Sequence, residues 1–453
     1  MTTDHHVSLN RAEYGERYAL LKFPTPQQAE EAEAHRCELL AAIGTRASLG
    51  CGGTKIDARR LSPGCAICVA GRWSCLFING RCNALCFYCP SSQEETGAPT
   101  TNALTFRNAA DYAEYIGAFG FTGASFSGGE PLLTPERTLA YLEAVKKRHG
   151  AGVHTWLYTN GPLVDTEIIA RLREAGLDEI RFDIGAIGYS LEKVRLAVGR
   201  IPTVTVEIPA VPEERLHMGQ KLVEMADCGV NHLNLHQLRL TPYNFQKFQG
   251  RGYTFLHGEK VTVLESELTA LELIRESLDR QIDLPVNYCS FVYKNRYQRQ
   301  AARLRNAAFV IKGWEDLTEA GCIRTLTLQG AAPAVARQLQ RLRDAGVDPQ
   351  RYSLNRAGDR LSLPAEFLPR EDTAGLGISI TYSAAQQLER VSYRNPFVEV
   401  RLETGTKIVV ERRPLCAETL LGEDPRGDRI MPLLEQAPWI DFEKVRLGLA
   451  RYG

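Results

Sequence analysis

The sequence predicts an α/β protein in which six strand–helix units form a parallel sheet, preceded by an N-terminal extension and followed by a C-terminal α+β domain. Two observations lead to this fold class. Short apolar runs alternate with helical patterns between about residues 75 and 280, and a separate group of strand and helix patterns occupies the last third of the chain. Alternating strands and helices give a parallel sheet with right-handed crossovers. The predicted domains are 1–74, 75–308 and 309–453.

The six predicted strands are short apolar runs, as expected for strands that are buried on both faces. They cover residues 75–80, 124–129, 155–161, 180–186, 204–211 and 233–240. The helices between them carry recognisable end signals. Predicted helices run over 134–150, 165–175 and 261–280, and the first two stop at Gly150 and Gly176. The first 50 residues are mainly helical, with a capped helix that ends at Gly44.

The C-terminal domain has its own pattern. A strand at 322–330 precedes a helix at 331–346, and a further strand follows it. Residues 397–413 read as a hairpin that turns at Glu403-Thr404-Gly405. This domain carries no motif that indicates its role.

Composition narrows the class of protein. Lys plus Arg and Asp plus Glu both number 54, so the formal net charge is zero. A neutral chain gives no electrostatic reason to expect binding to nucleic acid or to a membrane surface. No apolar run approaches the roughly 18–20 residues that span a bilayer, and the N-terminus has no signal-peptide core. We therefore expect a cytoplasmic protein.

Cysteines are concentrated in one part of the chain. Seven of the twelve lie between residues 51 and 89, while Cys37, Cys228, Cys289, Cys322 and Cys416 are isolated and expected to serve packing. In a reducing compartment such a group indicates metal ligation rather than disulfides. Soft thiolates at short spacing select zinc or iron–sulfur clusters.

The segment from Cys82 through Cys86 to Cys89 has the spacing C-x3-C-x2-C. A structural zinc site or a closed ferredoxin cluster uses four protein ligands. Three thiolates on a four-iron, four-sulfur (4Fe–4S) cluster leave one iron open, and an open iron can bind another molecule.

Two glycine motifs follow. The predicted strand at 124–129 runs into Gly128-Gly129-Glu130-Pro131, and the strand at 155–161 ends in Thr159-Asn160-Gly161. The cysteine motif followed by these two strand ends resembles the radical S-adenosylmethionine (SAM) superfamily. The resemblance covers about residues 75–280 and implies a partial, TIM-like (β/α)6 barrel with its chemistry at the carboxyl ends of the strands.

The resemblance also implies the cofactors and several site residues. A 4Fe–4S cluster on Cys82, Cys86 and Cys89 would bind SAM, and an electron from a flavodoxin or ferredoxin-type reductant would cleave SAM to a 5′-deoxyadenosyl radical that abstracts hydrogen from the substrate. The implied cofactor-binding residues are Tyr88 near the adenine, Gly128, Gly129 and Glu130 at the methionyl amine, and Asn160 at the ribose or carboxylate. Asp183, Glu207 and His236 are polar residues in apolar strands, so each is either a cofactor or substrate contact or a structural polar group.

Four more thiols precede the first motif: Cys51, Cys65, Cys68 and Cys75. We interpret them as ligands of an auxiliary 4Fe–4S cluster, with a structural zinc or no metal as the alternatives. Cys75 begins the first barrel strand, so this cluster is expected near the lower or middle part of the barrel, on the side where substrate enters.

Two further segments carry polar residues. Residues 238–253 form a loop at the active-site end, expected to be a lid or a substrate contact. Residues 286–305 place Arg296, Arg299 and Arg303 on one helical face, which is either an anion-binding surface or a solvated basic face.

The leading functional hypothesis is a radical SAM enzyme, an oxidoreductase or rearrangement catalyst, that acts on a small organic molecule. The alternatives are a maturase that modifies a peptide or protein, a glycyl-radical activase, and a non-catalytic iron–sulfur electron-transfer protein. An activase is usually little more than the barrel, which the large C-terminal domain does not fit. The intact Gly128-Gly129-Glu130 motif argues against an electron carrier.

Overall fold

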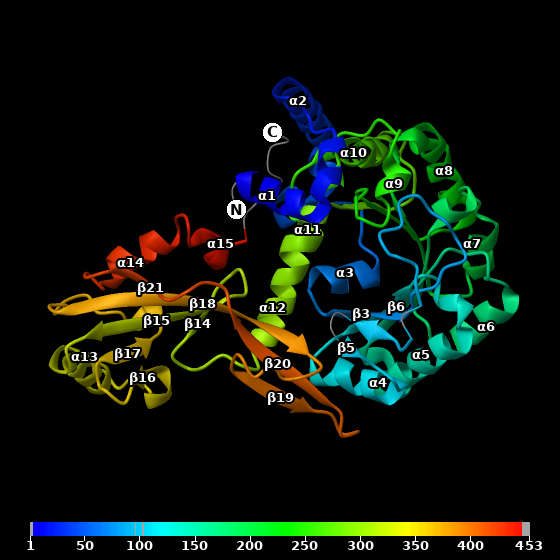
Figure 1. Ribbon diagram of the computed structural model, residues 1–453. Coiled ribbons are helices and arrows are strands. Elements are labelled where there is room, and N and C mark those ends of the chain that lie inside the picture. The colour runs from blue at the N-terminus through cyan, green and yellow to red at the C-terminus, as the bar shows by residue number, and fades with distance from the viewer. Residues whose placement is uncertain (1–2, 96, 102–103, 446–453) are drawn as a thin grey trace. The chain divides into compact units, whose positions relative to one another are not determined.

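The structure is a computed structural model that describes residues 3–95, 97–101 and 104–445 (Figure 1). Its described residues separate into two compact units, 3–298 and 299–445. The first unit contains both cysteine groups and the glycine motifs, so the chemistry predicted from the sequence belongs to this unit.

Parallel strands form the centre of the first unit. They are β3 (Trp73–Asn79), β6 (Gly123–Gly128), β7 (His154–Thr159), β8 (Glu179–Phe182), β9 (Thr203–Pro209), β10 (His232–His236) and β13 (Val286–Cys289). They lie in the sheet in the order β13-β10-β9-β8-β7-β6-β3. The first six match the six strands predicted from the sequence, and the partial radical SAM-type barrel is confirmed.

Shorter antiparallel strands extend both edges of this sheet. On one edge β2 (Lys55–Ala58) pairs with β13, and β1 (Ala47–Gly50) pairs with β2. On the other edge β4 (Thr100–Thr101) pairs with β3, and β5 (Leu104–Thr105) pairs with β4. The sequence analysis did not identify β2 or β13, because each is only four residues long and mixes polar with apolar residues.

Helices connect the strands and surround the sheet in Figure 1. They are α1 (Thr3–Tyr14), α2 (Pro26–Ile43), α3 (Pro63–Val69), α4 (Ala109–Ala118), α5 (Pro135–His149), α6 (Thr166–Glu174), α7 (Glu192–Ala197), α8 (Arg215–Cys228), α9 (Phe245–Phe248), α10 (Leu264–Asp279) and α11 (Phe291–Tyr293). Side-chain caps are present at the starts of α2 and α6, whereas Thr134 forms no such cap at the start of α5. Thr25 and Gln28 form a capping box at the start of α2, and Asp165 caps α6.

Some predicted boundaries are wrong. The predicted helix over 261–280 begins only at Leu264, because Thr262–Val263 form β12, which pairs with β11 (Phe255–Leu256). The predicted strands 180–186 and 233–240 end early, at Phe182 and His236. Both strands end where the following residues, Asp183 and Gln237, line a cavity.

The second unit is an antiparallel sheet with flanking helices. Its strands are β14 (Asp316–Leu317), β15 (Ile323–Gly330), β16 (Ser353–Leu354), β17 (Arg360–Leu363), β18 (Leu376–Leu388), β19 (Phe397–Arg401), β20 (Lys407–Pro414) and β21 (Thr419–Gly422). Its helices are α12 (Arg299–Ala307), α13 (Ala332–Asp344), α14 (Gly427–Leu434) and α15 (Ile440–Glu443). The predicted hairpin is β19–β20, and Gly405 at its turn has φ of +92°. The C-terminal α+β domain is confirmed.

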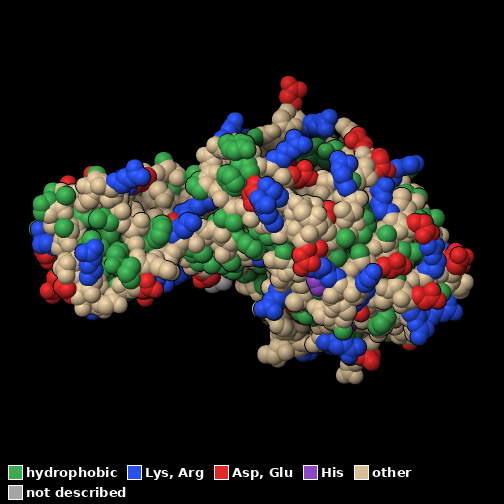
Figure 2. Space-filling model, turned by 90° about the horizontal axis from the view of Figure 1, so that it is seen from below, with side chains coloured by type: hydrophobic (Ala, Val, Ile, Leu, Met, Phe, Trp, Pro, Cys, Tyr) green, Lys and Arg blue, Asp and Glu red, His purple; other side chains and the backbone are tan. Residues whose placement is uncertain are grey.

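No helix in the described part of the chain is long and apolar enough to cross a membrane. Basic and acidic side chains are interspersed over the face shown in Figure 2, as the zero net charge leads one to expect.

Candidate active site

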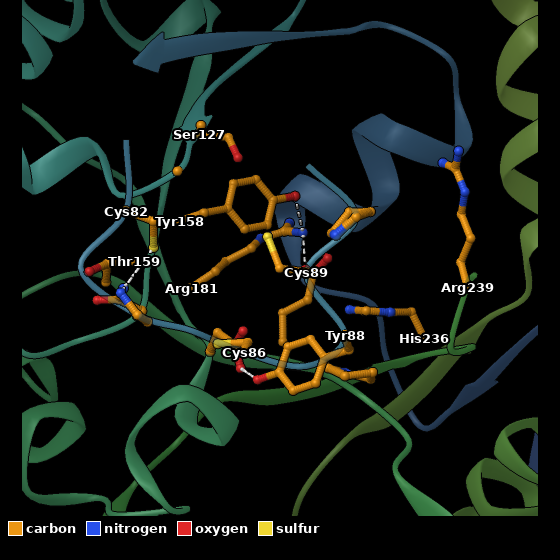
Figure 3. A pocket seen from close by; sticks show the side chains of 18 of the residues that line it. Cys82, Cys86, Tyr88, Cys89, Ser127, Tyr158, Thr159, Arg181, His236 and Arg239 are labelled. Carbon is orange, nitrogen blue, oxygen red and sulfur yellow. Dashed lines mark hydrogen bonds and ion pairs between the residues drawn. The ribbon is translucent and has the colours of Figure 1, made fainter. Parts of the chain in front are cut away.

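A cavity of about 310 Å³ opens at the carboxyl ends of the parallel strands. Ends of parallel strands are where α/β sheets and barrels place their ligands. Figure 3 shows Cys82, Cys86, Tyr88 and Cys89 together, while Tyr158, Arg181 and His236 enter from β7, β8 and β10. Predicted site residues that line the cavity are Cys82, Cys86, Cys89, Tyr88, Gly128, Gly129, Asn160, Asp183, Glu207 and His236. Glu130 is buried beside the cavity rather than lining it.

The three motif cysteines lie on the loop that follows β3. Burial raises the pKa of Cys86 to about 11 and holds the pKa of Cys82 above its usual value. A metal centre is what would keep such thiols ionised near neutral pH. Among the residues that the structure describes, no three His, Cys, Asp or Glu side chains converge closely enough to bind one metal ion.

The glycine pair lets the end of β6 lie directly against this cysteine loop. Backbone N–H groups of Gly129 and Glu130 donate to the carbonyls of Asn79 and Arg81, at 2.9 and 2.8 Å. A Cβ atom on Gly128 would collide with the Asn79 carbonyl oxygen, and one on Gly129 with that of Arg81. Only glycine permits this approach. The pair therefore fixes the cysteine loop to β6, in addition to lining the cavity.

Glu130 ties two strand ends together. Its carboxylate accepts hydrogen bonds from the backbone N–H groups of Asn160 (2.7 Å) and Leu132 (2.9 Å) and from the Thr159 hydroxyl. These contacts join the end of β6 to the end of β7. Burial raises the pKa of Glu130 to about 7, with a smaller contribution from Asp183, against the opposing effect of the hydrogen bonds.

This carboxyl group gives the fold a testable pH dependence. Because the pKa of Glu130 is about 7 in the folded state and near its ordinary value of 4.5 in the unfolded state, the folded state binds an extra proton between these pH values. Stability is therefore lost as the pH rises from about 4.5 to about 7. Urea unfolding of wild type and Glu130→Gln across pH 4.5–8 should show the wild type losing on the order of 3 kcal/mol relative to the variant. A difference that does not change with pH would contradict this.

Asn160 lies between the cysteine loop and the cavity. Its Nδ2 donates to the Cys82 sulfur at 3.4 Å and to Asn83 Oδ1 at 2.6 Å. Its Oδ1 atom is buried without a hydrogen-bond partner. A buried acceptor left unpaired is costly, so Oδ1 is suited to accept a hydrogen bond from a bound ligand.

Tyr88 and Asp183 form a pair across the cavity mouth. The Tyr88 hydroxyl donates to Asp183 Oδ1 at 2.8 Å. Burial raises the pKa of Asp183 to about 6, although Tyr88 and the N–H groups of Gly185 and Ala186 donate to it. Burial and the neighbouring Asp183 also raise the pKa of Tyr88, so the phenol keeps its proton.

An arginine lies among carboxylates at the inner end of the cavity. Arg181 donates to Glu207 at 2.7 Å and to Glu179 at 2.9 Å, and its guanidinium lies 5.0 Å from the Trp156 ring centre. Burial acts to raise the pKa of Glu207, but the adjacent Arg181 charge outweighs it and the net pKa is lowered. Both carboxylates are thus held ionised around one buried cation.

A second cation comes from a segment whose role the sequence left open. Lys294, in the π-helical turn Lys294–Gln298, lines the cavity and lies 5.2 Å from the Phe291 ring centre. Burial lowers the pKa of His236 to about 3, and Lys294 acts in the same direction, so the imidazole is neutral near neutral pH. No motif marks Lys294, and only the position of β13 brings it to the site.

The predicted basic segment consists of the π-helical turn Lys294–Gln298, which carries Arg296, and α12, which carries Arg299 and Arg303. Arg296 pairs with Glu259 at 2.8 Å, and Arg303 donates to the Ala320 carbonyl at 2.7 and 2.9 Å. Arg296 and Arg303 are thus each engaged by a neighbouring group of the protein, and an anion-binding role for this segment stays a prediction.

The loop over 238–253 packs on the cysteine loop. Asn244 donates to the Tyr88 carbonyl at 3.2 Å, and Lys247 donates to the Cys86 carbonyl at 3.3 Å. The Arg251 guanidinium lies 3.6 Å from the Phe87 ring centre. Leu238 and Arg239 line the cavity, so the start of this loop reaches the site while its remainder supports the cluster-binding segment.

Comparison with known proteins agrees with this site. The model of the radical SAM superfamily matches residues 76–204. A protein of Methanocaldococcus jannaschii is 32% identical over 279 residues, which is 58% of this chain and 72% of that protein. The chain belongs to the radical SAM superfamily. The M. jannaschii protein carries the provisional name of a glycyl-radical enzyme activating enzyme.

Other matches to this radical SAM protein are partial. An Fe-coproporphyrin III synthase of Methanosarcina barkeri is 27% identical over 139 residues, covering 31% of this chain and 33% of that protein. The solved coproporphyrinogen III oxidase of Escherichia coli has a TM-score of 0.31 at 11% identity, covering 49% of this chain and 57% of that one.

Membership of the superfamily implies a 4Fe–4S cluster and SAM as cofactors, and the residues present fit both. Three thiols face one cavity without a fourth cysteine in their loop, which matches a cluster with one open iron. The unpaired Oδ1 of Asn160 offers an acceptor beside them.

Proposed function

We propose that this chain cleaves SAM reductively at a 4Fe–4S cluster on Cys82, Cys86 and Cys89 and abstracts a hydrogen atom from a small organic substrate. The observation that carries the proposal is that one cavity is lined both by these three thiols and by the cationic side chains of Arg181, Arg239 and Lys294. The cofactor supplies the radical chemistry. The residues of this chain would bind and orient SAM and the substrate, and they would exclude water from the site.

We assign SAM binding and substrate binding to different residues that line the cavity. Tyr88, Gly128, Gly129 and Asn160 border the thiols and are the candidates to hold SAM. Asp183 is engaged by Tyr88, which fixes the ring in the position where it borders the cavity. Glu207, His236 and Lys294 lie farther along the wall and are the candidates to contact substrate.

The cations favour a substrate that carries an anionic group. The Lys294 ammonium forms no ion pair within 4 Å among the described residues; it lies 5.2 Å from the Phe291 ring centre, and its charge acts on Glu207 and His236. An ammonium group left unpaired in a cavity is suited to a carboxylate or phosphate. Arg181 is already shared between Glu179 and Glu207, so Lys294 is the better candidate for that contact.

An external reductant of the flavodoxin or ferredoxin type would supply the electron. Leu85, directly before Cys86, is 85% exposed, so the cluster-binding loop reaches the protein surface. This exposure supports electron entry at this loop.

The upstream cysteines support a second, auxiliary 4Fe–4S cluster in the same unit. Cys65 and Cys68 belong to α3, and Cys75 belongs to β3, the first strand of the barrel. This part of the proposal is separate from SAM cleavage, which requires only the first cluster.

A second candidate is activation of a partner protein by forming a glycyl radical on it. The relative at 32% identity, named for that activity, is the observation that favours it. In that case the cations near the cavity would meet an extended polypeptide rather than a small anion.

The test is anaerobic incubation of iron-loaded protein with dithionite and SAM, followed by mass spectrometry for 5′-deoxyadenosine. We expect 5′-deoxyadenosine to form, and small carboxylate- or phosphate-bearing metabolites to accelerate its formation. Deuterium transfer from labelled substrate into 5′-deoxyadenosine identifies the hydrogen donor. If the fully iron-loaded protein forms none with any candidate, the radical function is wrong. If only a partner protein accelerates it and gains a glycyl radical, the second candidate replaces the first.

A further inference from the structure

The auxiliary site contains a thiol that the sequence left isolated. Cys289 is the last residue of β13, far along the chain from the cysteine-rich segment. We propose that Cys289 joins Cys51, Cys65 and Cys68 as the four ligands of the auxiliary 4Fe–4S centre, and that Cys75 is not a ligand. This inference rests on the proposed auxiliary cluster but not on SAM cleavage.

Sheet register brings Cys289 to this group. Strand β2 pairs antiparallel with β13 so that Lys55 lies opposite Cys289. Cys51 begins the turn Cys51–Gly53 that leads into β2, and the Ser290 N–H donates to the Thr54 carbonyl at 3.1 Å. The end of β13 is therefore fixed beside the turn that carries Cys51.

Helix α3 brings the other two thiols. In Figure 1 it lies within the ring of barrel elements. The Gly64 N–H at its start donates to Glu179 of β8 at 3.1 Å, and Ile67 lies against Gly123 at the start of β6. The helix therefore lies near the amino ends of β6 and β8, while Asn234 of β10, which contacts Cys65, is paired with Asn287, two residues before Cys289 in β13. Cys289 lies within electrostatic range of both Cys65 and Cys68, and Cys51 lies within range of Cys68.

Hydrogen-bond donors are aimed at the sulfur atoms. Asn234 Nδ2 donates to Cys65 Sγ at 3.1 Å, and Gln298 Nε2 donates to Cys68 Sγ at 2.8 Å. The Tyr293 hydroxyl lies 3.6 Å from Cys68 Sγ. Amide and hydroxyl donors to sulfur are the contacts that tune iron–sulfur clusters. A thiol that serves only to pack the protein interior does not require hydrogen-bond donors at its sulfur.

A buried lysine adds the charge that such a centre needs. The Lys55 side chain is 2% exposed, pairs with Asp57, and lies 6.0 Å from the Tyr293 ring centre. Cys289 and Cys65 are among the groups whose charge acts on Lys55. A cluster held by four thiolates is an anion, so a buried ammonium beside these thiols stabilises it.

Cys75 has different surroundings. It lies in the regular part of β3, opposite Ser125 of β6, and its thiol is hydrogen-bonded with the Ser125 side chain. The charged groups that act on it are Cys68, together with Glu207 and Arg181, which line the active-site cavity. The Cys75 thiol is therefore engaged within the sheet by Ser125, and we assign Cys289 in its place among the four ligands.

A zinc ion fits this group poorly. Tetrahedral zinc would hold its thiolates within about 4 Å of one another. No three potential ligands among the described residues are arranged to share a single ion. The larger spacing around an iron–sulfur cluster agrees with thiols delivered from a turn, a helix and a strand.

The test counts iron in a background where the first cluster cannot form. The Cys82→Ala, Cys86→Ala, Cys89→Ala variant is reconstituted anaerobically with iron and sulfide, and iron and acid-labile sulfide are measured after gel filtration. This background should hold about four irons per chain. Adding Cys289→Ser should reduce the iron to about one per chain or less, whereas adding Cys75→Ser should leave it at about four.

Several outcomes overturn the assignment. Retention of iron by Cys289→Ser with loss from Cys75→Ser restores the upstream set Cys51, Cys65, Cys68 and Cys75. Loss from both variants also contradicts it, as does a background that binds zinc instead of iron. Far-UV circular dichroism and thermal unfolding of the metal-free forms separate ligand loss from misfolding, and Cys289→Ala is made in parallel. Because the background cannot cleave SAM, the result is independent of the radical reaction.

Discussion

The Cys82→Ala, Cys86→Ala, Cys89→Ala variant is expected to form no detectable 5′-deoxyadenosine under conditions in which the wild-type protein does. The three thiols border one cavity with Tyr88 and Asn160, and the chain offers no other cysteine on that loop. Without thiolate ligands the cluster cannot bind, and reductive cleavage of SAM has no electron source. Mass spectrometry after anaerobic reduction with dithionite measures the loss.

Two single variants serve as matched controls. Cys37→Ala changes an exposed thiol on α2, and Cys228→Ala changes the last residue of α8; both should keep the activity of wild type. The triple variant should also keep the absorbance of the auxiliary cluster, since those ligands lie elsewhere in the barrel. Formation of 5′-deoxyadenosine by the triple variant would show that the first cluster is bound by other residues.

Replacing Arg181 with Met is expected to lower the free energy of unfolding by about 3–5 kcal/mol, the range for removing one partner of a buried ion pair. Arg181 is 3% exposed and neutralises Glu179, which is fully buried, together with Glu207. The variant leaves both carboxylates without their cation in a medium that solvates charge poorly. Urea unfolding monitored by circular dichroism measures the change.

Exposed Arg171 provides the control for this variant. Its guanidinium lies 2.7 Å from both carboxylate oxygens of Glu136, but at the protein surface. Exposed ion pairs contribute little, so Arg171→Met should change stability far less than Arg181→Met. Equal effects would mean that the buried network around Arg181 does not stabilise the barrel. A double variant, Arg181→Met with Glu207→Gln, should recover part of the loss, because one unpaired charge is removed.

Short stretches of sequence were sufficient to predict the strands, motifs and helix ends whose residue pattern spans only a few positions. The six apolar runs predicted the strands β3, β6, β7, β8, β9 and β10, because strands covered on both faces need continuous apolar residues. The spacing of Cys82, Cys86 and Cys89 and the two glycine motifs predicted the superfamily. Helix ends at Gly150 and Gly176 followed from glycine's tolerance of positive φ, which is +53° and +86° at these positions.

Other features depend on contacts between distant parts of the chain. The Glu130 carboxylate receives hydrogen bonds from Asn160 and Thr159 at the end of β7, and no local pattern in the sequence encodes these contacts. Lys294 reaches the cavity because β13 continues the parallel sheet beyond the sixth predicted strand. Short strands of mixed polarity carry too weak a pattern to be recognised, since their burial is decided by their neighbours.

Cys289 shows most clearly the difference between what the sequence predicts and what the tertiary structure decides. In the sequence it is one isolated thiol, 200 residues beyond Cys89, and a packing role was the reasonable expectation. The antiparallel register of β2 on β13 places it opposite Lys55 and close to Cys65 and Cys68. Residue types and spacing therefore determined the fold class, the radical SAM motif and the presence of a thiol-rich segment. Which thiols and charges meet was decided only by the tertiary structure, because strand pairing sets contacts that sequence distance does not record.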